Sequence, residues 1–299
     1  MTLCGRYSTI KTVTSTITGR IDLAWDNDRC AMVAMKITGD TACEFSLDNP
    51  TQEIAMLESL QSGGDHFGKK YIVQMLDKMQ SSDQTCLVME FAPCGDLFDL
   101  LDSVESHMST QTALVYIQQI AEGISYLHQN NVAHMDISLE NILVDEQGNI
   151  KICDFGLACR VPNREAVRCV GKPAYMAPEL ANPGLVEDYY DPRSADVYSL
   201  GVCLFALLFG FFPYERIGDE RFEVLKTYGV NALFGCYGLN PSPPIADLLE
   251  SMLAPVPYRS TVDMVVAQLS LIQEKFVSHT DTNTVEVLDA GAQALMVIG

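Results

Sequence analysis

The chain has 299 residues, 48% of them apolar, so it can bury a sizeable core as one two-lobed enzyme or as two small domains. Its 39 acidic and 19 basic residues give a net charge of −20, which argues against binding to nucleic acid or to an anionic membrane. The same charge fits a solvated acidic surface or a preference for basic peptide substrates.

The ten cysteines form no C-x-x-C pair and no cluster with histidine at zinc spacing. They are scattered through apolar segments, which is typical of reduced thiols, so we expect an intracellular, cytoplasmic protein. No charged start followed by an apolar run marks a signal peptide, and the longest apolar stretch, 200–212, is too short to span a bilayer. We therefore expect no membrane insertion.

Residues 6–37 have the composition of three β-strands. Thr, Val and Ile dominate 7–18, and a turn at 26–28 leads to a third, apolar strand over 31–37. Lys36 lies inside that apolar strand. A lone lysine there commonly extends to solvent, but its compact ammonium also suits a point contact with phosphate.

A helix is predicted from Pro50, with Asn49 as its cap, because apolar residues then recur at helical spacing (Ile54, Leu57, Leu60). Two further strands are predicted over 71–77 and 85–91. Pro93-Cys94-Gly95 breaks the chain after them and indicates a boundary between two lobes. Beyond it, a short helix from Asp96, a long helix over 112–129 and an apolar helix over 194–209 predict a helical second half.

The loop His134-Met135-Asp136-Ile137-Ser138-Leu139-Glu140-Asn141 offers a carboxylate, Asp136, and an amide, Asn141. The apolar runs 142–144 and 150–153 flank a turn, which predicts a β-hairpin. That hairpin would bring Asn141 together with a second carboxylate, Asp154. Two such oxygen ligands, with room left for phosphate and water, suit Mg²⁺, and Asp136 beside the metal could accept the proton of an attacking hydroxyl.

This loop, followed by Asp154-Phe155-Gly156, resembles the catalytic loop and D-F-G segment of the eukaryotic protein kinase family. Further matches follow the family's order along the chain: Val33-Ala34-Met35-Lys36, Glu53, Ala177-Pro178-Glu179 and Asp196. The resemblance covers residues 6–275 and implies an α+β fold with a small β-rich N-lobe over about 6–92 and a larger, mainly helical C-lobe over about 93–275. Residues 276–299 are left as a C-terminal tail without an assigned role.

The resemblance implies a site for ATP and Mg²⁺, in which Lys36, paired with Glu53, holds the α- and β-phosphates. Asn141 and Asp154 would hold Mg²⁺, and Asp136 would orient the substrate hydroxyl and take its proton. Around adenine, the backbone of Glu90 and Ala92 would form hydrogen bonds and Met89 would guard the inner pocket. The other implied contacts of nucleotide or substrate are Val13, Gly19, Ile21, Ala34, Asp96, Glu140 and Leu143. For Asp96, a plain helix cap is an equal alternative.

Three more residues have structural roles in the family pattern. His134 would stack under Phe155, and Asp196 would hold the backbone of the catalytic loop. Arg259 is a candidate ion-pair partner of Glu179.

The chain departs from the family in its phosphate loop, where Thr14 and Thr16 replace two of three glycines and only Gly19 remains. Glycine lets the backbone approach phosphates closely, so the replacements would weaken ATP binding without removing the backbone N–H groups. The activation segment, 154–179, departs as well, because it contains no Ser, Thr or Tyr between Gly156 and Tyr175. Met135 also replaces the arginine that grips the loop phosphate. We therefore expect a segment that is ordered without its own phosphorylation.

A further pair of positions has exchanged residue types. Ser138 stands where Ser/Thr kinases carry a lysine, and Lys172 stands where they carry a threonine. We expect Lys172 to reach back and supply the cation that stabilises the transferring phosphoryl group. An ordinary surface lysine is an equal alternative.

Together these features predict an ATP-dependent protein kinase that acts on Ser or Thr, because the catalytic loop lacks the sequence of tyrosine kinases. Glu140 and Asp96 suggest a basic residue in the substrate. The main alternative is a pseudokinase that binds partners as a scaffold, favoured by Thr14, Met135 and Ser138. A small-molecule kinase is disfavoured by the Ala177-Pro178-Glu179 segment.

Overall fold

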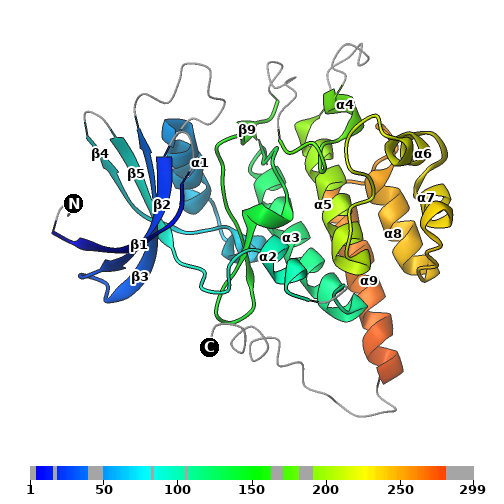
Figure 1. Cartoon of the computed structure of the whole chain (residues 1–299), viewed down its shortest axis with the longest axis horizontal. Coiled ribbons are helices and arrows are strands. Elements are labelled where there is room, and N and C mark those ends of the chain that lie inside the picture. The colour runs from blue at the N-terminus through cyan, green and yellow to red at the C-terminus, as the bar shows by residue number, and fades with distance from the viewer. Residues whose placement is uncertain are drawn as a thin grey trace.

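The computed structural model describes residues 5–15, 19–39, 50–81, 84–104, 107–162, 171–181 and 191–280. Thr16, Asn49, residues 163–170 of the activation segment and the tail beyond 280 lie outside these ranges. The described chain forms two lobes that lie side by side, with a sheet in the first and helices in the second (Figure 1). The predicted two-lobed α+β fold is thereby confirmed.

The N-lobe is an antiparallel sheet with the strand order β1-β2-β3-β5-β4. Its strands are β1 (Tyr7–Ser15), β2 (Gly19–Asp26), β3 (Ala31–Gly39), β4 (Met75–Gln80) and β5 (Gln84–Glu90). In β3, Val33, Met35 and Ile37 are buried in a small core. Because side chains alternate along a strand, Lys36 lies on the opposite face from Met35 and Ile37.

The helix α1 (Pro50–Ser62) packs against β4 and β5 and begins at the predicted proline. The strand expected over 71–77 is wrong in its first half, where a short 3₁₀ helix, η1 (Phe67–Tyr71), leads into β4. Ile72 and Val73 are buried, and the Val73 N–H donates to Ile152 O at 2.9 Å. The apolar run there therefore reflects packing between the lobes rather than a place in the sheet.

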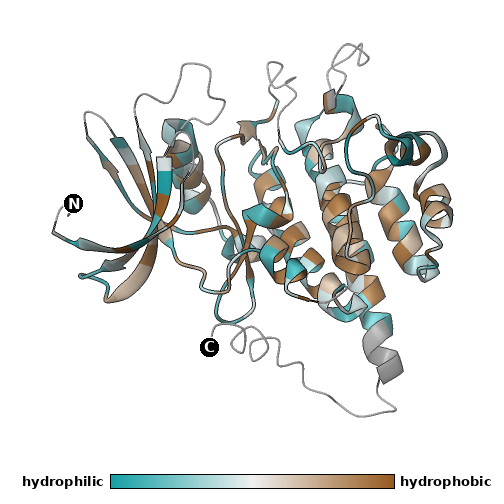
Figure 2. Ribbon diagram, in the orientation of Figure 1, coloured by the Kyte–Doolittle hydropathy of each residue, from teal (hydrophilic) through white to brown (hydrophobic). Residues whose placement is uncertain are grey.

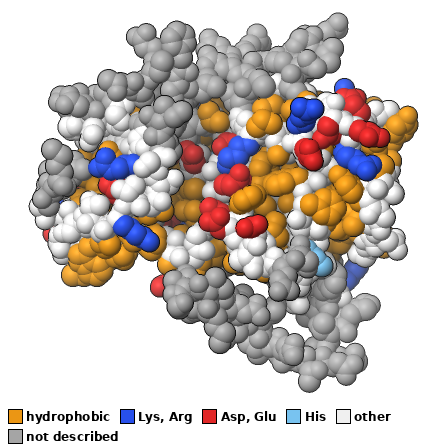
Figure 3. Space-filling model, in the orientation of Figure 1, with side chains coloured by type: hydrophobic (Ala, Val, Ile, Leu, Met, Phe, Trp, Pro, Cys, Tyr) orange, Lys and Arg blue, Asp and Glu red, His pale blue; other side chains and the backbone are white. Residues whose placement is uncertain are grey.

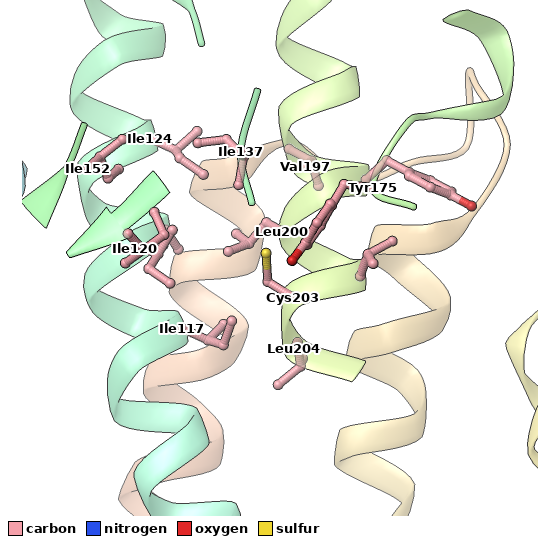
Figure 4. Packing of buried hydrophobic residues seen from close by; sticks show 14 of the residues in the cluster. Ile117, Ile120, Ile124, Ile137, Ile152, Tyr175, Val197, Leu200, Cys203 and Leu204 are labelled. Carbon is pink, nitrogen blue, oxygen red and sulfur yellow. The ribbon is translucent and has the colours of Figure 1, made fainter. Parts of the chain in front are cut away.

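The C-lobe surrounds two buried helices, α3 (Thr110–Gln129) and α5 (Pro192–Phe209). Their apolar side chains meet in the centre of the lobe (Figure 4). The other helices are α2 (Leu97–Asp102), α4 (Pro178–Ala181), α6 (Glu220–Tyr228), α7 (Val230–Tyr237), α8 (Pro243–Leu253) and α9 (Val262–Thr280). The last of these extends to Thr280, into the expected tail.

Hydropathy colouring shows α5 as mostly apolar (Figure 2). Within the described ranges it is the one helix long and apolar enough to cross a membrane by length and composition, and 78% of its 18 residues are buried inside the protein. An all-round apolar helix is typical of a lobe core. The burial of α5 fulfils the prediction made for 194–209.

Short pairs of strands connect these helices to the catalytic loop. β7 (Ile142–Val144) and β8 (Ile150–Ile152) form the predicted hairpin, with Ile142 opposite Ile152. β6 (Val132–Ala133) pairs with β9 (Cys159–Arg160), so the start of the activation segment is hydrogen-bonded to the chain just before the catalytic loop. A 3₁₀ turn, η2 (Leu139–Asn141), completes that loop.

Candidate active site

Lys36 and Glu53 form an ion pair between β3 and α1. The Lys36 ammonium donates to Glu53 Oε2 at 2.8 Å and to Asp154 Oδ1 at 3.0 Å. The Glu53 side chain is 2% exposed, and its other oxygen accepts the Phe155 N–H at 3.2 Å. One lysine and one glutamate thus connect the sheet, α1 and the Asp154-Phe155-Gly156 segment.

The backbone of the catalytic loop is held from the core helix α5. Asp196, which is 1% exposed, accepts the N–H groups of His134 and Met135, each at 2.8 Å. Its carboxylate also contacts His128 Nε2 at 2.9 Å. Met135 has a φ of 67°, a left-handed conformation that costs a bulky side chain free energy unless its surroundings fix it. The Asp196 hydrogen bonds supply that constraint.

His134 packs beneath Phe155, edge to face, with ring centroids 4.9 Å apart. The Asp136 N–H donates to His134 Nδ1 at 3.3 Å, so the ring proton lies on Nε2, which donates to Cys153 O at 3.0 Å. The histidine is completely buried and its two nitrogens are both used. It positions the loop against the Phe155 segment.

Asp136 and Asn141 lie together at the start of the hairpin. The Asn141 amide donates to Asp136 Oδ2 and to Asp136 O, both at 2.8 Å. The Cys153 N–H donates to Asn141 O at 3.0 Å, which brings Asp154 to the same end of the hairpin. Asp154 has a φ of 63° and a side chain that is 44% exposed, so its carboxylate faces an accessible space.

This donor set fits a magnesium ion. Across the described ranges, no hydrogen bond uses Asn141 Oδ1 or Asp154 Oδ2, while the neighbouring atoms of both groups are engaged. Amide and carboxylate oxygens are ligands that Mg²⁺ accepts, with the remaining positions taken by phosphate and water. Those same ranges contain no group of three or more His, Cys, Asp and Glu side chains that could hold a metal ion by themselves.

The two carboxylates have pKa values displaced in opposite directions. Burial raises the pKa of Asp136, although the charge of Lys172 and the Asn141 hydrogen bond oppose it. Burial also acts on Asp154, but the charge and hydrogen bond of Lys36 outweigh it and lower its pKa. Asp136 is therefore the better proton acceptor, and Asp154 is the more firmly ionised ligand.

The expected adenine contacts lie on β3, β5 and the segment that joins the lobes. Ala34 is paired opposite the buried Met89. The Glu90 N–H donates to Gln74 O at 2.9 Å, so of the Glu90 backbone only the carbonyl oxygen could face adenine. Ala92, two residues later, is buried. The remaining expected contacts are Val13, 56% exposed on β1, with Gly19 and Ile21 on β2 and Leu143 on β7.

Gly19 has a packing role that the sequence reasoning missed. A Cβ at this position would lie 2.0 Å from Ile37 O on β3, so no larger residue fits without moving the strand. Thr14 is the last but one residue of β1 and is exposed. Asp96 caps α2 by accepting the Asp99 N–H at 2.8 Å.

Lys172 and Ser138, the exchanged pair, are in direct contact. The Lys172 ammonium donates to Ser138 Oγ at 2.6 Å and lies 3.6 Å from Glu140 Oε1. Tyr175 OH donates to Glu140 Oε2 at 2.8 Å and accepts the Leu139 N–H at 3.3 Å. Sequence reasoning used Tyr175 only as part of a motif, and no local signal indicated its contact with a loop 35 residues earlier.

Acidic and basic side chains are interspersed on the face in view, with several acidic side chains near its centre (Figure 3). The predicted pair of Arg259 and Glu179 also forms, with nitrogen–oxygen distances of 2.5 and 3.1 Å. Both side chains are almost completely buried. The end of the activation segment is thereby attached to the helical core.

Comparison with known proteins agrees with this geometry. The family model described as the protein kinase domain matches residues 7–270. The chain is 35% identical over 160 residues to maternal embryonic leucine zipper kinase of Danio rerio, covering 52% of this chain and 22% of the relative. It is 38% identical over 153 residues to serine/threonine-protein kinase chk1 of Schizosaccharomyces pombe, covering 50% of this chain and 29% of the relative.

CBL-interacting protein kinase 24 of Oryza sativa subsp. japonica is 30% identical over 268 residues, covering 87% of this chain and 55% of the relative. The matches to these three relatives thus span between 22% and 55% of the relatives' own lengths. The family model, in contrast, covers most of this chain and includes each of the residues assembled above. The chain belongs to the protein kinase domain family.

Proposed function

We propose that the chain transfers the γ-phosphoryl group of ATP to Ser or Thr hydroxyls of protein substrates. The observation that carries the proposal is the closed contact of Lys36 with both Glu53 and Asp154, at 2.8 and 3.0 Å. That contact requires β3, α1 and the Asp154 segment to lie together, which is the arrangement that phosphoryl transfer needs.

Each residue has a task in this reaction. Lys36 contacts the α- and β-phosphates, and Glu53 fixes the direction of its ammonium. Asp136, held by Asn141, accepts a hydrogen bond from the substrate hydroxyl and takes its proton. Asn141 and Asp154 would hold Mg²⁺, which would neutralise charge on the phosphates. Catalysis then rests on positioning and on charge neutralisation.

The preference for protein substrates and for Ser or Thr is supported by the relative from Schizosaccharomyces pombe, which is named a serine/threonine-protein kinase. The Gly171–Tyr175 segment lies against the catalytic loop, where a peptide acceptor would bind. A basic residue in the substrate would need a carboxylate that is accessible. Glu140 already contacts Tyr175 and Lys172, so Asp96, a partly exposed helix cap, is the better candidate.

We also propose that this activity needs no phosphate on the activation segment. Met135 is 6% exposed and packs in the C-lobe core where an arginine would receive the phosphate. Gln52 of α1 donates to Ala158 O at 2.9 Å, and β9 pairs with β6. These contacts support a segment that is held by packing. Its residues 163–170 lie outside the described ranges.

Measured turnover decides the proposal. Wild type and Asp136→Asn are assayed with Mg²⁺ and ATP on matched peptides that differ only in a Ser, Thr or Tyr acceptor. We expect phosphorylation of the Ser and Thr peptides and its collapse in the variant, with both proteins melting at similar temperatures. Absence of turnover in the wild type, together with absence of Mg²⁺-dependent ATP binding, would establish the scaffold alternative instead.

In the described part of the chain, Lys36 contacts Glu53 and Asp154, and Asn141 contacts Asp136; these contacts argue against the scaffold alternative.

For location, we propose an intracellular protein. The seven cysteines on described residues are free thiols, and Cys86, Cys159 and Cys203 are buried. Burial raises the pKa of Cys86 to about 12, so this thiol is unreactive. Imaging of a tagged chain tests the location.

A further inference from the structure

The ammonium of Lys172 lies against the catalytic loop, although the residue belongs to the activation segment. It donates to Ser138 Oγ at 2.6 Å, and Ser138 is itself completely buried two residues after Asp136. An ammonium has three N–H groups, and one of them is used by Ser138. Glu140, at 3.6 Å, is near enough for attraction but not for a hydrogen bond.

The backbone holds this side chain in place. The Lys172 N–H donates to Asp136 Oδ1 at 3.3 Å, so the residue is attached directly to the carboxylate that would take the proton. Gly171, before it, has a φ of 92°, and a Cβ there would lie 2.9 Å from Met135 O. Glycine therefore permits the close approach of the two segments. Residues of both segments therefore contribute to this contact.

Lys36, the other lysine of the site, is already paired with carboxylates. Lys36 is held between Glu53 and Asp154 by two short hydrogen bonds, so its charge is balanced by carboxylates. Lys172 is 36% exposed in its side chain and lowers the pKa of Asp136 through its charge. Of the two lysines, it is the one on the Asp136 side of the site, where charge on the transferring group must be neutralised.

We propose that Lys172 supplies from the activation segment the positive charge that stabilises the transferring phosphoryl group, in place of a lysine at position 138. The inference rests on the proposed kinase function. In the step, the bond from the γ-phosphorus to the β–γ bridging oxygen breaks and its electron pair leaves with ADP. A bond from the acceptor oxygen to the γ-phosphorus forms, the hydroxyl proton passes to Asp136, and Lys172 stays protonated throughout.

A cation supplied by the activation segment differs in one respect from a cation on the catalytic loop itself. Here the charge reaches the site only when residues 171–175 are docked against Met135 and Asp136. Docking of this part of the activation segment therefore also completes the catalytic site. The segment can therefore control turnover through its position, which needs no phosphorylated residue.

The test compares four variants with the wild type in the peptide assay. Lys172→Met removes the charge, Lys172→Arg keeps it, and Ser138→Lys/Lys172→Thr moves it to the catalytic loop. Lys226→Met, a half-exposed lysine on α6, is the matched control. We expect Lys172→Met to lower kcat by about 10²-fold with little change in KM for ATP. Arginine and the exchanged pair should recover most of that loss, and Lys226→Met should equal wild type.

A second readout does not depend on turnover. Calorimetry measures binding of Mg·ADP alone and of Mg·ADP with fluoroaluminate, which occupies the position of the transferring group. Lys172→Met should bind Mg·ADP as wild type does and lose the added affinity that fluoroaluminate gives. Equal fluoroaluminate binding in both proteins, or equal kcat, would overturn the role of Lys172. Wild-type protein that shows the fluoroaluminate gain but phosphorylates none of the peptides would reject the proposed substrates and leave the binding result to decide Lys172.

Discussion

The main-chain N–H of Phe155 donates to Glu53 Oε1, while the other oxygen of the same carboxylate accepts the Lys36 ammonium. Both hydrogen bonds of Glu53 therefore form only when α1 and the segment that begins at Asp154 are each in the position seen here. Because the side chain is buried, neither hydrogen bond can be replaced by water without cost.

Replacing Glu53 with Gln should lower kcat/KM on the order of 10²-fold, because the amide cannot hold both the ammonium and the Phe155 N–H as a carboxylate does. Steady-state kinetics with ATP and peptide measure the change. Glu58→Gln is the control, since Glu58 lies on the same helix with a 44% exposed side chain and should leave the rate unchanged. Equal losses in the two variants would show that the effect comes from α1 itself.

The rate should fall in acid at a higher pH than an ordinary aspartate would give. Asp136 must be ionised to take the proton, and burial raises its pKa, so the base is lost as pH falls through that raised value. His134, Lys172, Asn141 and Asp154 are the groups that face it. Removing the Lys172 charge removes an effect that lowers this pKa.

Lys172→Met should therefore move the acid limb of kcat/KM to still higher pH, and Lys226→Met should leave it in place. Rate profiles of both variants and of wild type measure the limb. An unchanged limb in Lys172→Met would mean that the ammonium does not act on Asp136.

Most of the fold could be predicted from the sequence because its signals are local. The apolar run over 31–37 predicted β3, Pro50 marked the start of α1, and the turn at Gly148 predicted the β7–β8 hairpin. The strand predicted over residues 71–74 was wrong because residues 71–73 are buried against the C-lobe, and no local pattern reveals that contact. The same limit applies to Gly19, whose close neighbour is the carbonyl of Ile37 on another strand.

The site could be predicted where residue types identify chemistry, as for Asp136, Asn141 and Asp154. The exchange at Ser138 and Lys172 was visible as two substitutions, but their contact depends on how the activation segment folds back. Tyr175 was missed as a partner of Glu140 for that reason.

Breaking the Arg259–Glu179 pair should destabilise the C-lobe. Glu179→Ala leaves the buried guanidinium of Arg259 without its carboxylate, so the free energy of unfolding should fall by about 3 kcal/mol. Chemical denaturation measures it. Glu223→Ala, which removes a half-exposed partner of Lys226, should change stability by less than about 1 kcal/mol.

Phosphatase treatment should not change the turnover of the purified chain. The activation segment has no Ser, Thr or Tyr between Gly156 and Tyr175, and Met135 occupies the place of the phosphate-binding arginine. Initial rates before and after treatment, with mass spectrometry to confirm removal of phosphate, test this. A loss of rate that returns on rephosphorylation would show that a phosphate elsewhere in the chain controls the site.

Asp196 explains how the start of the catalytic loop can keep its path although Met135 departs from the family pattern. It holds the loop through backbone N–H groups, which every residue other than proline possesses, and it does so from the buried core helix α5. The start of the loop is thus positioned from the core by contacts that do not depend on the side chain at 135. Under the role proposed for Lys172, the catalytic charge comes from another segment while the proton acceptor, Asp136, stays on the loop that Asp196 positions.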